Sequence, residues 1–160
     1  FAHISDHTKV LRIINGGVDN SPLLDPERLH TMTGIRAGQY LDYAALRGDT
    51  SDGLPGVKGV GDKTAASLLQ KYDDLDGVRA AALDPSSDLG PGPRGKIKEA
   101  AAYLDVAPKV VAVARDIDLP RDHLALPRVP ADPDQLAALV ERWSLSSPVE
   151  RLTGVLASRR

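Results

Sequence analysis

The chain has 160 residues, a net charge of −2 and no cysteine. This length fits one domain of ordinary size, and the lack of cysteine excludes disulfide scaffolds, thiolate zinc sites and cysteine nucleophiles. No apolar run approaches the ~18 residues that span a bilayer, and the balanced charge gives no overall basic footprint for nucleic acid. We therefore expect a soluble, cytoplasmic protein that makes no contact with membranes.

The chain opens with a segment typical of a β-strand. Residues 8–14 are rich in β-branched side chains and stop at Asn15-Gly16-Gly17, which predicts a strand closed by a turn. No later segment offers this strand a partner, and an isolated strand is unstable because its backbone groups stay unpaired. Residue 1 is Phe rather than Met. We therefore expect a piece of a longer protein, with a segment missing upstream.

Helical patterns dominate the rest of the chain. The spacing of apolar residues, with glycine stops after the first two, predicts helices over residues 26–33, 37–47, 63–72, 75–83, 134–143 and 148–157. Another helical pattern resumes at Lys96 and is broken or restarted by Pro108. Between these helices, we expect loops over 48–61 and 84–95 and an extended connection over 118–133. The sum is a mainly α fold with one N-terminal strand, and with Trp143 in its core.

The Gly-rich stretch over residues 48–65 carries most of the functional information. Its glycines at 56, 59 and 61 do not follow the dinucleotide-binding spacing G-x-G-x-x-G. A phosphate-binding P-loop is excluded because Asp62 stands before Lys63 and would point a carboxylate at the phosphates. An EF-hand does not fit, because its loop needs oxygen ligands at positions 1, 3 and 5, whereas Asp49 and Asp52 stand at positions 1 and 4 and no Glu closes the loop.

The remaining interpretation of this stretch is a helix–hairpin–helix. The Gly59-Val60-Gly61 segment predicts a tight turn that uses the positive φ open to glycine. The next helix begins near Asp62, and the free N–H groups of a helix N-terminus bind anions such as phosphate. The alternative is an ordinary Gly-rich turn between two helices. The expected contacts to the DNA backbone are Lys58, Gly59, Gly61, Lys63 and Thr64.

Two acidic residues directly precede the hairpin. Asp49 and Asp52 lie three positions apart, so their carboxylates can share one face of a helical turn. Two hard oxygen donors suit Mg²⁺ or Mn²⁺, especially where a phosphate completes the coordination shell. Aspartate also caps helices and turns, and spacing alone favours that structural role.

Other residues give weaker signals. Arg94, Lys96 and Lys98 form a small basic cluster near a helix start, which fits a second phosphate contact or a solvated helix face equally well. His3 and His7 lack the further ligands of a zinc site, so we expect them to be solvated.

Residues 43–65 closely resemble the signature of bacterial 5′-3′ exonucleases. This flap-endonuclease-like 5′ nuclease family includes the N-terminal nuclease domain of DNA polymerase I. The resemblance rests on paired aspartates, Leu54-Pro55-Gly56, a Gly-hydrophobic-Gly hairpin and a Lys-Thr-Ala helix start, all in order. It implies a helical H3TH DNA-binding domain over residues 21–160, with the helix–hairpin–helix at about 54–72. Residues 1–20 then resemble the last strand of an α/β (PIN-like) nuclease domain.

The resemblance also implies a chemistry and a set of partners. Asp49 and Asp52 correspond to catalytic carboxylates that help bind two or more Mg²⁺ or Mn²⁺ ions, and backbone carbonyls near Val57 and Val60 to a K⁺ site. Directly after the second aspartate, where some family members carry Asn, this chain has Gly53. The implied activity is metal-assisted hydrolysis of duplex, nicked or 5′-flap DNA in replication and repair.

The same resemblance predicts what is missing. The family's other metal-binding carboxylates lie upstream of the region that this chain resembles. We therefore expect the chain by itself to bind DNA weakly, as a monomer, and to cleave it poorly or not at all. The parent protein either stands alone or continues into a polymerase domain. The alternative function is a non-enzymatic helix–hairpin–helix DNA-binding module.

Overall fold

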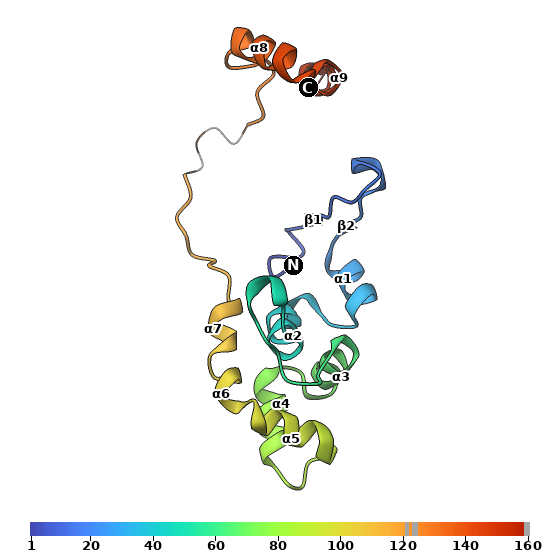
Figure 1. Cartoon of the computed structure of the whole chain (residues 1–160), viewed down its shortest axis with the longest axis vertical. Coiled ribbons are helices and arrows are strands. Elements are labelled where there is room, and N and C mark those ends of the chain that lie inside the picture. The colour runs from blue at the N-terminus through green and yellow to red at the C-terminus, as the bar shows by residue number, and fades with distance from the viewer. Residues whose placement is uncertain (121, 123–124, 159–160) are drawn as a thin grey trace. The chain divides into compact units, whose positions relative to one another are not determined.

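The computed structural model describes residues 1–120, 122 and 125–158 (Figure 1). The chain divides into two compact units, Phe1–Arg115 and Asp116–Arg160. Residues 121, 123 and 124 of the predicted extended connection lie outside the described part. The remaining residues of that connection up to 132 form no helix or strand, as Pro120, Pro127 and Pro130 predict, whereas Pro133 already begins the next helix. The predicted limit of a preceding domain at residue 20 stays a prediction.

The N-terminal strand has a partner within the chain. Strand β1 (Val10–Leu11) pairs antiparallel with β2 (Leu23–Leu24), with Val10 opposite Leu24 and Leu11 opposite Leu23. The expectation of an unpaired strand over 8–14 is therefore wrong. A two-residue strand is too short to show alternation in the sequence, which is why β2 was missed. Leu24 is fully buried and forms a small apolar cluster with Ile4 and Leu29.

Helices make up most of the described residues, which confirms the mainly α class. The α-helices are α1 (Pro26–Thr33), α2 (Tyr40–Arg47), α3 (Asp62–Tyr72), α4 (Leu75–Leu83), α5 (Pro91–Glu99), α6 (Ala101–Leu104), α7 (Ala107–Val111), α8 (Pro133–Trp143) and α9 (Ser146–Ser158). Short 3₁₀ helices are η1 (Val18–Asn20), η2 (Ala37–Gln39) and η3 (Thr50–Asp52). None of the helices in the described residues combines the length and apolar character needed to cross a bilayer.

The main core of the first unit lies among helices α2 to α7. Helix α2 packs against α3 and α7, α3 against α4, and α4 against α5. Their apolar faces bury a continuous cluster whose largest members include Leu46, Leu69 and Leu104, all without exposed surface. Burial of such faces is the main stabilising contribution in a domain of this size.

Helix α5 differs from the sequence expectation. It begins at Pro91, five residues before Lys96, where the sequence predicts a loop. The first turn of a helix tolerates proline because its N–H groups need no partner there. The predicted restart at Pro108 is confirmed, since α7 begins one residue earlier.

Trp143 corrects the expected core of the second unit. It ends α8 with 61% of its surface exposed, and it stacks with the guanidinium of Arg142. The described part of the second unit contains only the α8–α9 helical pair, which is too small to enclose an indole. The prediction that Trp143 lies in the core is therefore wrong.

Two backbone segments cross at the end of α2 and fix the position of the hairpin. Asp49 and Leu54 form an isolated antiparallel bridge, and the Val57 N–H donates to the Leu46 carbonyl oxygen at 2.9 Å. At the crossing, a Cβ on Gly56 would lie 2.4 Å from the Arg47 carbonyl oxygen, and Gly56 has a φ of 69°. Only glycine fits there.

The two glycines of the predicted turn differ from each other. Gly59 has the expected positive φ, 72°. Gly61 does not: it is the extended N-cap of α3, with a φ of −101°. The prediction of a left-handed turn residue is confirmed for Gly59 and wrong for Gly61.

The crossing predicts a sharp difference between two glycine-to-alanine substitutions. Gly56→Ala should lower the free energy of unfolding by at least about 2 kcal/mol, because alanine adds a backbone clash to an unfavourable φ. Gly61→Ala should cost less than about 1 kcal/mol, since its Cβ would meet nothing within 4 Å. Urea unfolding of both variants checks this, and equal losses would contradict the tight crossing.

Candidate functional site

The two predicted metal-binding aspartates lie on one short loop. Asp49 is the N-cap of η3, and its Oδ1 atom accepts hydrogen bonds from Ser51 N at 3.1 Å and from Ser51 Oγ at 2.6 Å. The same Ser51 hydroxyl lies 3.5 Å from Oδ1 of Asp52. One hydroxyl thus touches both carboxylates. Asp49 therefore caps a turn, and its carboxylate lies close to that of Asp52 on either side of the Ser51 hydroxyl.

The environment of Asp49 favours the ionised carboxylate. The hydrogen bonds from Ser51, foremost, and the nearby Arg47 guanidinium lower the pKa of Asp49 below its ordinary value. The Arg47 Nη2 atom lies 3.3 Å from Asp49 Oδ2. Asp52 is exposed to solvent. The loop therefore offers an ionised carboxylate, Asp49, next to an accessible one, Asp52.

These carboxylates fit part of a divalent-metal site. Hard oxygen donors on an exposed loop are the ligands that Mg²⁺ and Mn²⁺ prefer. Within residues 1–120, 122 and 125–158, however, no group of three or more acidic or histidine side chains is placed to bind a metal. Asp49 and Asp52 can therefore supply two ligands, and water, phosphate or other protein groups would have to complete the shell.

Arg47 joins this loop to the start of α3. Its Nη1 atom lies 3.3 Å from Oδ1 of Asp62, the first residue of α3, and its guanidinium stacks 5.3 Å from the centre of the Tyr43 ring. The Tyr43 hydroxyl donates to the same Asp62 oxygen at 2.7 Å. Arg47 therefore contacts both Asp49 and Asp62.

Tyr43, Arg47 and Asp62 form a network that the sequence did not predict. The pKa of Asp62 is lowered, mainly by the hydrogen bond from the Tyr43 hydroxyl and also by Arg47. The pKa of Tyr43 is raised to about 12, mainly by burial and also by its hydrogen bond to Asp62. An acidic residue at the first position of a helix that is expected to bind phosphate was the available signal, because its charge would repel phosphate unless a cation offset it.

The N-terminus of α3 has the features of an anion site. No side chain caps its N–H groups, and the space around its N-cap residue, Gly61, is free of other protein atoms within 4 Å of where a Cβ would lie. Lys58 and Lys63 are exposed, and Thr64 is half-buried. An open cavity of about 510 Å³ lies beside it, with Arg12, Arg47, Lys63 and Asp62 in its lining. Free N–H groups and cations together attract phosphate.

The hairpin that precedes α3 is anchored in the core. Val57 and Val60 are buried, and the Val60 N–H donates to the Val57 carbonyl oxygen at 2.9 Å. The Gly59 carbonyl oxygen accepts a hydrogen bond from Nζ of Lys96 at 2.9 Å. Two of the carbonyls expected near a K⁺ ion are therefore engaged within the protein.

The predicted basic cluster does not act as one group. The Arg94 guanidinium donates to backbone carbonyls at the end of α4 and in the following loop, including those of Ala81, Ala82 and Leu89. This is a structural role, because a phosphate contact through Arg94 would require breaking these bonds. Lys96 points to the hairpin instead.

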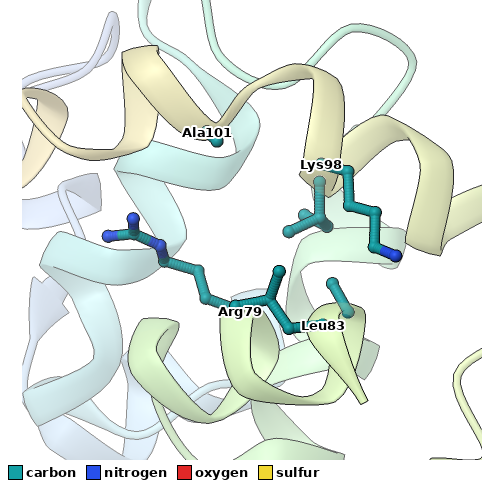
Figure 2. Close-up of a pocket in the computed structure, with 6 residues that line it drawn as sticks. Arg79, Leu83, Lys98 and Ala101 are labelled. Atoms are coloured by element: carbon teal, nitrogen blue, oxygen red, sulfur yellow. The ribbon is translucent and has the colours of Figure 1, made fainter. Parts of the chain in front are cut away.

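Lys98 lies elsewhere on α5. It lines a small pocket of about 60 Å³ between α4 and the α5–α6 segment, with Arg79 and Leu83. Figure 2 shows the Lys98 amine and the Arg79 guanidinium pointing to opposite sides of this pocket. Residues two apart on a helix face in nearly opposite directions, so Lys96 and Lys98 do not share a surface.

Comparison with known proteins gives a consistent result. Residues 35–134 match the family described as 5′-3′ exonuclease, C-terminal SAM fold. The chain is 47% identical over 142 residues to a 5′-3′ exonuclease from Streptomyces coelicolor, which covers 89% of this chain and 47% of that protein. A 5′-3′ exonuclease from Mycobacterium tuberculosis is 41% identical over 148 residues, 88% of this chain and 46% of that protein.

A longer kind of protein is also similar. A DNA polymerase I from Deinococcus radiodurans is 31% identical over 155 residues, which cover 94% of this chain and 15% of that protein. The chain thus spans about half the length of the 5′-3′ exonucleases that it matches, and a smaller share of the polymerase.

The buried Tyr43 hydroxyl predicts an alkaline loss of stability. Its folded pKa of about 12 exceeds its ordinary value of 10.0, so between these values the folded state holds more protons than the unfolded state. Stability should therefore fall as pH rises from about 10 to about 12. Tyr43→Phe should be less stable by about 1 kcal/mol at neutral pH.

Tyr43→Phe should also lose stability less steeply at high pH. Burial raises the pKa of Tyr40, Tyr72 and Tyr103 as well, so the slope should shrink rather than vanish. Urea unfolding at neutral and alkaline pH measures this. An identical pH dependence in both proteins would show that Tyr43 does not titrate as the structure predicts.

Proposed function

The chain belongs to the 5′-3′ exonuclease family, and on that premise we propose that it forms the duplex-DNA-binding part of a metal-dependent 5′-3′ exonuclease and flap endonuclease. The observation that carries this proposal is the connection made by Arg47. This side chain contacts a candidate metal ligand, Asp49, and the first residue of the candidate phosphate-binding helix, Asp62. DNA held at α3 would therefore lie close to the carboxylates.

DNA is held through its backbone in this proposal. The N–H groups at the start of α3, the ammonium groups of Lys58 and Lys63 and the hydroxyl of Thr64 bind phosphate oxygens. Gly61 allows close approach, and Gly59 shapes the turn that presents these groups. Such contacts position a protein on duplex DNA and carry no sequence information directly. Recognition would then depend on the shape of the DNA, in agreement with action on duplex, nicked or 5′-flap substrates.

The chemistry requires divalent cations. When bound, paired Mg²⁺ or Mn²⁺ ions activate water and stabilise the leaving oxygen in phosphodiester hydrolysis. Asp49 and Asp52 would hold such ions, and Ser51 would orient Asp49 through its two hydrogen bonds. Two carboxylates are few for a two-ion site, so this chain by itself should cleave DNA weakly or not at all.

The wider biological setting is part of the proposal. We propose that the parent protein acts in replication and repair in the cytoplasm. The relatives named 5′-3′ exonuclease and DNA polymerase I support a parent that either stands alone or is joined to a polymerase domain. For the chain itself we propose a monomer.

A second candidate is a DNA-binding module without catalysis. The observation that favours it is the cap that Asp49 provides to η3, together with its ion pair to Arg47, because these contacts explain the residue without any metal. The two candidates differ in their response to divalent ions.

Salt dependence tests the DNA-binding part of the proposal. The affinity for a fluorescent duplex should fall steadily as salt rises, because phosphate contacts release counterions. Lys63→Met should weaken binding at every salt concentration and reduce the slope of log K against log salt by about 1. Lys109→Met removes a charge from an exposed residue of α7 and should change neither value. A chain that binds no duplex even at low salt would overturn the proposal.

Metal binding tests the catalytic part. Titration with Mn²⁺, followed by electron paramagnetic resonance, should show that Asp49→Asn with Asp52→Asn weakens binding by roughly tenfold or more, since even outer contacts to a metal ligand are worth that much. The double variant should keep its affinity for duplex DNA without metal. Unchanged Mn²⁺ binding would favour the DNA-binding module over the nuclease.

A further inference from the structure

We propose that the ammonium group of Lys96 is the resident cation of the hairpin and takes the place of a bound potassium ion. This inference rests on the proposed function, because it concerns the hairpin that would contact DNA. It predicts that the chain binds duplex DNA without any requirement for potassium.

The Lys96 side chain meets the hairpin at its turn. Its Nζ atom donates to the Gly59 carbonyl oxygen at 2.9 Å, although the two residues are 37 positions apart in the sequence. A Cβ on Gly59 would lie 2.8 Å from Nζ and 3.3 Å from Cε. The ammonium end of Lys96 therefore lies directly on the glycine backbone, where any side chain at position 59 would displace it.

The position of Lys96 is fixed by its neighbour on α5, which is buried in the core. The next residue, Ile97, is buried in the core between α4 and α5, and Lys96 itself is half-buried. In the described part of the chain no carboxylate lies within ion-pair distance of Lys96. Its positive charge is therefore not neutralised by an acidic neighbour, and the Gly59 carbonyl is the acceptor that it contacts.

A potassium ion does not fit the same hairpin while Lys96 is in place. Backbone carbonyls bind K⁺ by replacing several water molecules of its hydration shell. Here the ammonium of Lys96 already occupies the space beside the Gly59 oxygen, 2.9 Å from it. A second cation at Gly59 would also repel the ammonium at short range. An ammonium and a potassium ion carry the same charge, so Lys96 supplies the stabilisation that the ion would give.

The test compares duplex binding in matched salts. Fluorescence anisotropy is measured with a labelled duplex in KCl and in N-methyl-D-glucamine chloride, both at about 0.1 M so that screening is equal. The unsubstituted chain should bind with the same affinity in both salts. Lys96→Met should bind roughly tenfold more weakly in the potassium-free salt, the size expected for a lost charged hydrogen bond, and recover in KCl.

Two further variants separate the cation from the fold. Lys96→Arg keeps a cation at the hairpin and should remain independent of potassium. Lys98→Met removes the same charge from α5 at a residue that lies on the α4 pocket (Figure 2), and it should also remain independent of potassium. Thermal unfolding without DNA gives a second readout: KCl should raise the Tm of Lys96→Met and leave that of the unsubstituted chain unchanged.

The outcomes distinguish this inference from the proposed function. Potassium-dependent binding or a potassium-dependent Tm in the unsubstituted chain would overturn it. A Lys96→Met variant that folds, binds DNA weakly and gains nothing from KCl would also overturn it, because Lys96 would then act as a phosphate contact. If no variant binds duplex in any salt, the proposed function fails, and the Tm comparison still decides the role of Lys96.

Discussion

The rest of the site depends on the close crossing of two backbone segments, residues 47–49 and 54–57. The contact is possible because Gly48 and Gly56 have no side chains: a Cβ on either would lie within 3 Å of backbone atoms of the other segment. The crossing closes the loop that carries Asp49 and Asp52, and it joins the hairpin to the end of α2 through the Val57–Leu46 hydrogen bond. The carboxylates and the hairpin therefore have a fixed relation to each other.

This geometry is consistent with the proposed binding of DNA by a chain that has no excess of basic residues. Arg47 emerges at the crossing and contacts Asp49 on one side and Asp62 on the other. The guanidinium offsets the Asp62 charge near the N-terminus of α3, which would otherwise repel phosphate. Local pairing of opposite charges, backbone N–H groups and a few lysines can then attract an anion in a protein of net charge −2.

The sequence predicted those features that depend on neighbouring residues. Helix α1 is an example: Asp25 caps it and Gly34 ends it, as the pattern indicates. Features that depend on contacts far along the chain were missed. The Tyr103 hydroxyl donates to Ala45 O and accepts from Gly56 N, and the Arg94 guanidinium binds carbonyls around the end of α4. Neither pairing leaves a signal in local spacing, because the partners are backbone groups that every residue carries.

These distant contacts show that the shape of the hairpin is not determined by the signature alone. Its two ends are held by residues outside the signature, at Gly56 by Tyr103 of α6 and at Gly59 by Lys96 of α5. The hairpin itself contributes only Val57 and Val60 to the core. A change that loosened α5 or α6 would therefore alter the presentation of the α3 N-terminus without touching any proposed phosphate contact. The later helices support the turn that is proposed to bind phosphate.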